Sequence, residues 1–156
     1  MKREVVVDAS LIIKRVVPES MSNKVKVLLR HWKQAGVLLI APAFFLAEVD
    51  SILRQKVVSR KELTLEQAQL SWEQLQEIPV ELMDMTPLRQ RAWKISIELQ
   101  QAHVYDSVYL ALAEAQGCEF WTADERLFNA SKSQFPFVKS LRRSVVENLD
   151  HRNTLK

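Results

Sequence analysis

Asp106 is the second residue of the segment YDSVYLALAEA, in which no side chain from Val108 to Ala113 is charged. On a helix its stripe continues into Leu110 and Ala113, at the i+4 and i+7 spacing that stacks side chains on one side. A carboxylate buried on such a stripe without a partner is costly, because it loses its hydration. The position therefore predicts a partner that compensates a negative charge.

Three further acids have the same potential. Asp8 directly follows the apolar run EVVV and Asp124 follows EFWTA, although each also suits a helix N-cap, where Asp accepts hydrogen bonds from free N–H groups. Glu48 lies in the apolar helical segment APAFFLAEVDSILRQ, on a stripe with Phe44, and a narrow solvent face is its competing interpretation. Asp106 itself could be a first-turn residue that favours the helix dipole.

Four carboxylates gathered in one cleft repel one another, by roughly 4 kcal/mol for a pair about 4 Å apart at an effective dielectric near 20. Such a group needs protons or a divalent cation to be stable. Oxygen ligands without histidine or cysteine select Mg²⁺ or Mn²⁺ over zinc or copper. Mg²⁺ keeps several waters, which leaves room for phosphate oxygens and an attacking water, as in metal-assisted phosphodiester hydrolysis.

The composition excludes other kinds of chemistry. Cys118 is the one cysteine, so an internal disulfide and a cysteine metal cluster are both impossible. The three histidines, His31, His103 and His151, show no zinc-binding spacing. The net charge of +3 and the pI of about 9.1 permit an anionic partner, of which nucleic acid is the commonest.

Apolar strand-like runs alternate with helical patterns and predict a single α/β domain. The expected strands are EVVVDAS, AGVLLIAP, IPVELMDM, QGCEFWTAD and the weaker FPFVKSL. The expected helices cover residues 21–34, 43–57, 65–76, 88–100 and 105–116. Continuously apolar strands between helices indicate a parallel sheet covered on both faces. Ligands of such sheets bind beyond the carboxyl ends of the strands, where Asp8 and Asp124 stand.

The length of 156 residues predicts one domain over 1–156, with a polar tail, HRNTLK, from about residue 150 that we expect to fray. No apolar run reaches the roughly 18 residues of a membrane span, so we expect no membrane association. The start, MKREVVVDAS, is too short in apolar residues for a signal peptide. These features predict a cytoplasmic protein.

Three segments, VVDASLIIKRVVPES, APAFFLAEVDSILR and YDSVYLALAEAQGCEFWTADERLF, in this order resemble a PIN-domain ribonuclease of the group that includes the VapC toxins of toxin–antitoxin pairs. The resemblance runs from Val5 to about Val138. The family's first motif, D-x-S/T, is matched by Asp8 and Ser10, and its later acids by Glu48, Asp106 and Asp124. Ser51 stands where many relatives carry Asn, which bears on the local support of the site.

The resemblance implies a three-layer Rossmann-like domain whose central parallel sheet of four to five strands is flanked by helices. It also implies a Mg²⁺ or Mn²⁺ site and cleavage of single-stranded RNA by metal-activated water. Asp8, Glu48 and Asp106 would be the inner ligands, and Asp124 would act through water or a second ion. Ser10 would support Asp8 or the metal-bound water.

The same resemblance implies partners. RNA would be held by basic residues near the cleft, for which the candidates are Lys14, Arg15, Arg54, Lys56, Arg60 and Arg126. Family members form homodimers, and an antitoxin would bury an apolar segment against the toxin; residues 43–57 and 65–76 are candidate surfaces. The alternative is a PIN-like RNA-binding or protein-interaction domain with little nuclease turnover. A receiver-type signalling domain is disfavoured, because VVVDAS lacks the adjacent acids that it needs.

Overall fold

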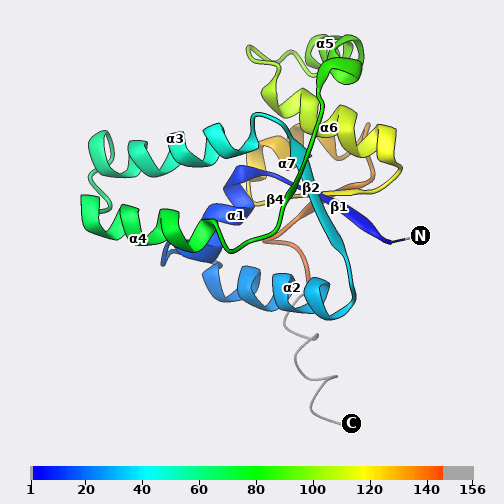
Figure 1. Ribbon diagram of the computed structural model, residues 1–156. Coiled ribbons are helices and arrows are strands. Elements are labelled where there is room, and N and C mark those ends of the chain that lie inside the picture. The colour runs from blue at the N-terminus through cyan, green and yellow to red at the C-terminus, as the bar shows by residue number, and fades with distance from the viewer. Residues whose placement is uncertain (1, 146–156) are drawn as a thin grey trace.

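The computed structural model describes residues 2–145, so the polar tail predicted from about residue 150 lies outside the described residues. Five strands form one sheet in which every pairing is parallel, in the order β3-β2-β1-β4-β5 (Figure 1). They are β1 (Glu4–Val7), β2 (Leu38–Pro42), β3 (Glu81–Met83), β4 (Glu119–Thr122) and β5 (Val138–Ser140). All five predicted strands, including the weakest, are confirmed.

The strand order reverses at the centre of the sheet. The chain builds outwards from β1 through β2 to β3, and then returns to place β4 on the other side of β1. Val6 accordingly pairs with Ile40 on one side and with Phe120 on the other. The crevice between the carboxyl ends of β1 and β4 is the switch point at which open α/β sheets bind their ligands.

The five predicted helices are present, and their ends lie within two residues of the expected ones. They are α2 (Ser22–Gln34), α3 (Phe45–Val58), α4 (Leu65–Leu75), α5 (Arg89–Glu98) and α6 (Tyr105–Gln116). A 3₁₀ turn, η1 (Thr86–Leu88), precedes α5. Two short helices, α1 (Ala9–Val16) and α7 (Glu125–Ser131), were expected only as the starts implied by possible caps at Asp8 and Asp124.

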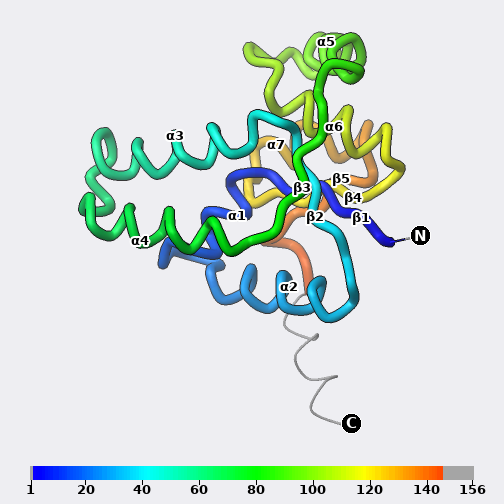
Figure 2. Tube along the Cα trace, viewed as in Figure 1, coloured from blue at the N-terminus to red at the C-terminus, as the bar shows by residue number. Residues whose placement is uncertain are grey.

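Helices cover both faces of the sheet, with α5 and α6 on one side and α1 and α2 on the other (Figures 1 and 2). Helix α6 contacts β1, β2 and β4, which explains why its sequence has almost no polar face. Its residues from Val108 to Ala113 are each at most 2% exposed. Gly117 ends the helix with φ of 61°, a left-handed conformation that glycine adopts without strain. Within residues 2–145, no helix is both long and apolar enough to cross a membrane.

Helices α3 and α4 form a hairpin that extends away from the sheet, to the left in Figure 1. Lys56 on α3 is only 4% exposed, and its ammonium group lies 3.0 Å from Glu19 and 2.8 Å from Glu62. The hairpin is thus tied to the segment that follows α1. The prediction of Lys56 as an RNA contact is wrong, because its charge is buried and paired inside the protein.

Candidate functional site

Asp8 lies at the carboxyl end of β1 and is only 5% exposed. Its Oδ1 accepts hydrogen bonds from the Ser10 hydroxyl at 2.7 Å and from the Leu11 backbone N–H at 3.0 Å. Its Oδ2 accepts a short hydrogen bond from the Thr122 hydroxyl at the end of β4. Because the Leu11 bond caps α1, the N-cap interpretation of Asp8 is confirmed. The same side chain nevertheless faces the switch point.

Two hydroxyl relays connect Asp8 to the turn after β4. The Ala123 N–H donates to Ser10 Oγ at 3.2 Å, and the Ser10 hydroxyl donates in turn to Asp8. The Asp124 N–H donates to Thr122 Oγ1 at 2.9 Å, and the Thr122 hydroxyl donates to the other carboxylate oxygen. Both oxygens are therefore fixed in direction by groups from the neighbouring strand end.

Thr122 was not predicted as a site residue from the sequence. It is fully buried, and its hydroxyl is bonded on both sides. The available signal was a hydroxyl residue on a buried strand, two positions before an acid. A buried hydroxyl needs a partner, and the acids at the strand ends were the nearest candidates.

Burial raises the pKa of Asp8 from its ordinary value of 3.8 to about 7. The hydrogen bonds from Thr122, Ser10 and Leu11 favour the charged form and oppose this shift, whereas the negative charge of Asp106 adds to it. Near neutral pH, the protonated and charged forms of Asp8 are therefore both populated. A cation beside it would displace the proton and remove the cost of the buried charge.

Glu48 lies in the first turn of α3 and is half-buried. Its Oε1 accepts a hydrogen bond from the Tyr109 hydroxyl at 3.1 Å, so its interpretation as a solvent-facing charge is wrong. Burial raises the pKa of Glu48, and the charge of Asp106 raises it further. The hydrogen bond from Tyr109 and one from the Ala9 N–H at the start of α1 oppose these effects.

Asp106 is the second residue of α6 and is half-buried, as its apolar stripe predicted. Burial raises its pKa, the charge of Asp124 raises it further, and His103 lowers it. Asp124 is exposed and caps α7, because its Oδ1 accepts hydrogen bonds from the N–H groups of Arg126 and Leu127. The helix-cap interpretation of Asp124 is confirmed, and its negative charge also acts on Asp106.

Asp106 is the electrostatic centre of the four acids, which we call the acidic site: Asp8, Glu48, Asp106 and Asp124. Its charge raises the pKa of Asp8 and of Glu48, and Asp124 acts on it in turn. Among residues 2–145, none of the four forms a salt bridge. Within this part of the chain, the site thus holds negative charge that no basic side chain pairs.

The donor atoms of the acidic site are all carboxylate oxygens. In the described part of the chain, no three His, Cys, Asp or Glu side chains form a ready-made group that could hold a metal ion. The donor set, all oxygen, fits Mg²⁺ or Mn²⁺. The assignment of four metal ligands remains a prediction.

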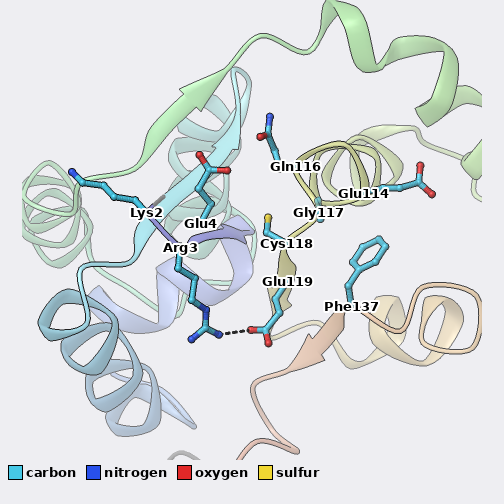
Figure 3. Close-up of a pocket in the computed structure, with 10 residues that line it drawn as sticks. Lys2, Arg3, Glu4, Glu114, Gln116, Gly117, Cys118, Glu119 and Phe137 are labelled. Atoms are coloured by element: carbon cyan, nitrogen blue, oxygen red, sulfur yellow. Dashed lines mark hydrogen bonds and ion pairs between the residues drawn. The ribbon is translucent and has the colours of Figure 1, made fainter.

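A surface cavity of about 960 Å³ lies at the opposite, amino-terminal edge of the sheet (Figure 3). It is lined by residues at the starts of β1, β4 and β5, among them Arg3, Cys118 and Phe137. One ion pair lies in its lining, with Arg3 3.2 Å from Glu119. The lining contains none of the predicted site residues.

Comparison with known proteins bears on the family of this chain. The model of the PIN domain family matches residues 5–132. The chain belongs to the PIN-domain family. The resemblance stated from the sequence motifs is therefore confirmed, and the matched span contains all four acids together with Ser10 and Thr122.

Solved structures share the fold of this PIN domain at low sequence identity. PAE2754 from Pyrobaculum aerophilum is 17% identical with a TM-score of 0.64, and the match covers 97% of this chain and 99% of that one. The Mycobacterium tuberculosis toxin VapC20, described as cleaving the sarcin–ricin loop, is 15% identical with a TM-score of 0.59, covering 84% and 95%. VapBC2 from Rickettsia felis, bound to a promoter DNA fragment, is 14% identical with a TM-score of 0.57, covering 88% and 98%. Among curated proteins, no sequence matches this chain.

Proposed function

We propose that this PIN domain is a Mg²⁺- or Mn²⁺-dependent endoribonuclease that cleaves single-stranded RNA, and that it is the toxin of a toxin–antitoxin pair. The observation that carries the proposal is a group of acids without a salt-bridge partner in residues 2–145, at the switch point of a PIN fold. The fold shared with the toxin VapC20 supports the choice of RNA and of a toxin.

In this proposal the side chains divide the work of hydrolysis. Asp8, Glu48 and Asp106 hold the divalent ion, and Asp124 acts on it from further out. The bound ion supplies an acidified water and neutralises the site for the approach of a phosphodiester. A carboxylate beside the ion would accept the water's proton.

The hydroxyls of Ser10 and Thr122 have a separate task. They hold both oxygens of Asp8, so that its carboxylate meets the ion without having to reorganise. The turn after β4 supplies the N–H groups that orient these hydroxyls. A shift of β4 relative to β1 would therefore disturb the first ligand of the site.

The RNA contacts fall to exposed basic residues beside the acids. Arg126 is exposed in the first turn of α7, two residues after Asp124. Arg54 is exposed on α3, nearly two turns beyond Glu48. Each contact with a phosphate adds affinity that falls as the salt concentration rises. Lys14 is less suited to this role, because its ammonium group lies 3.4 Å from Glu19.

Two exposed apolar faces support the proposed protein partners. On the α3–α4 hairpin, large apolar side chains that are 40–64% exposed include Leu46, Val58, Leu65, Leu70 and Trp72. We assign this face to an antitoxin, and the VapBC2 structure supports a partner of that kind. On α5, Trp93 is 62% exposed and Ile97 60%. Beside them lies a mainly apolar cavity of about 560 Å³, and we assign this second face to a homodimer.

The test is cleavage of an end-labelled single-stranded RNA by the full chain. We expect cleavage with Mg²⁺ or Mn²⁺, its loss with excess EDTA, and its return when Mn²⁺ is added back. Cleavage that survives EDTA would overturn the metal dependence. A folded protein that retards RNA on a gel without cutting it would favour the alternative, a binding or interaction domain with little turnover.

A further inference from the structure

Tyr109 carries a hydroxyl group into the interior on the same face of α6 as Asp106, one turn further along the helix. The side chain is fully buried, and its Oη donates a hydrogen bond to Glu48 Oε1 at 3.1 Å. The ring is held on two sides. It stacks on Phe120 with centroids 5.5 Å apart, and it meets Phe44 edge-on at 5.5 Å. A hydroxyl on a ring packed in this way has little freedom to move.

The Tyr109 hydroxyl acts only as a donor towards Glu48. The hydrogen bond from this neutral hydroxyl to the carboxylate is charge-assisted, because its acceptor carries a negative charge. The Ala9 N–H approaches the same carboxylate from the start of α1. The Glu48 carboxylate thus accepts hydrogen bonds from both α6 and α1.

We propose that Tyr109 is a positioning residue for Glu48, and that its hydroxyl fixes the carboxylate in the orientation in which it would bind the divalent ion. The inference rests on the proposed function. Helix α6 then contributes to the site twice, with Asp106 as a ligand and Tyr109 as the group that orients a ligand from another helix. Groups that orient metal ligands typically change metal affinity by roughly 10- to 100-fold when they are removed.

The test is Mn²⁺ binding by the full chain without RNA, measured from the electron paramagnetic resonance signal of unbound Mn²⁺. Tyr109→Phe removes the hydroxyl and keeps the ring, and we expect Mn²⁺ affinity to fall about tenfold or more. Tyr105→Phe is the matched control. It removes the same atom from the same helix, its ring also contacts Phe44, and its hydroxyl forms no hydrogen bond within residues 2–145. Its affinity for Mn²⁺ should equal that of the parent.

A double-mutant cycle separates positioning from general structure. If Tyr109 acts through Glu48, then Tyr109→Phe in a Glu48→Gln background should weaken Mn²⁺ binding by less than about twofold more. Independent, fully additive effects would overturn the inference, and so would equal affinity of folded Tyr109→Phe and the parent. Circular dichroism and the melting temperature establish folding in each variant.

A second measurement does not depend on a Tyr109 variant. The chain has two tyrosines, so in Tyr105→Phe the ring carbon of Tyr109 gives the single tyrosine Cζ resonance of a labelled sample. Adding Mg²⁺ should shift this resonance, and Glu48→Gln should abolish the shift; an unmoved resonance in protein that binds the ion contradicts the inference.

Failure of this inference and failure of the proposed function give different results. If the parent protein binds no Mn²⁺, both the proposed function and the role of Tyr109 are wrong. If the parent protein binds Mn²⁺ but does not cleave RNA, the proposed function alone is wrong.

Discussion

The amino and carboxyl edges of the central sheet differ in whether their charged side chains form ion pairs. At the amino edge, two acids form ion pairs with basic side chains. Arg3 pairs with Glu119 at 3.2 Å, and Arg91 binds Glu114 at 2.7 Å on the outside of α6. At the carboxyl edge, hydroxyl and backbone donors surround Asp8, and none of these donors carries a positive charge. The amino edge therefore has ion pairs between its own side chains, whereas the acids of the carboxyl edge depend on protons or on a bound cation to offset their charge.

This difference shows why volume alone is a poor guide to the site. The cavity of about 960 Å³ lies at the amino edge, where exposed ion pairs contribute little energy and no strong electrostatic demand remains. The carboxyl edge instead carries raised pKa values on three acids. Perturbed carboxyl groups at a topological switch point are the better indicator of function.

The largest effect expected from the comparison is on RNA cleavage. Asp8→Asn removes the charge at the carboxyl edge while keeping the side chain's size, and should reduce the cleavage rate by more than about a hundredfold. Glu119→Gln breaks the ion pair with Arg3 at the amino edge and should leave the rate within about twofold. The measurement is the single-turnover rate on a labelled RNA, with circular dichroism to show that both variants fold. Equal rates for Asp8→Asn and the parent would place the chemistry elsewhere.

The second effect is on stability in the absence of metal. Because folding raises the pKa of Asp8 from 3.8 to about 7, the native protein holds a proton that the unfolded chain releases above about pH 4. The free energy of unfolding should therefore fall as the pH rises from about 4 to about 7, and then level off, by about 1.4 kcal/mol for each pKa unit that is realised. Urea unfolding in EDTA at pH 5 and pH 8 measures the difference.

The matched variant for this second effect is again Asp8→Asn. It lacks the carboxyl group, so its stability should depend less on pH, and it should be more stable than the parent at pH 8. Mn²⁺ should raise the melting temperature of the parent more at pH 8 than at pH 5, because protons compete with the ion for the same carboxylate. An identical pH slope in the parent and in Asp8→Asn would refute the raised pKa of Asp8.

The contrast also separates what the sequence could predict from what it could not. The parallel sheet, the five helices and the placement of Asp8 and Asp124 at strand ends follow from short-range patterns of apolar residues, which local spacing records directly. The inward direction of Glu48 does not follow, because it depends on a tyrosine 61 positions away on another helix. The prediction for Lys56 was wrong for the same reason, because Glu19, one of the two acids that form ion pairs with it, lies far away in the sequence.

A smaller effect should come from Thr122, which joins the two halves of the switch point. Thr122→Val keeps the branched shape but leaves Oδ2 of Asp8 without its donor and the N–H of Asp124 without its acceptor. We expect a loss of about 1–3 kcal/mol in stability and roughly a tenfold loss of cleavage, measured by urea unfolding and single-turnover kinetics. Ser140→Ala, on the neighbouring strand β5, is the control. Its hydroxyl binds Glu125 rather than Asp8, so cleavage should remain near the parent rate.

The smallest effect concerns RNA affinity and extends the comparison to basic residues. Arg126→Gln removes an exposed charge two residues from Asp124 and should weaken RNA binding about threefold, with the slope of log K against log salt reduced by roughly 1. Arg3→Gln removes the same charge from the amino edge, where Glu119 already neutralises it, and should leave that slope unchanged. Fluorescence anisotropy of a labelled RNA in EDTA, at several salt concentrations, measures both. Equal slopes for the two variants would show that the RNA phosphates do not contact the carboxyl edge of the sheet in preference to the amino edge.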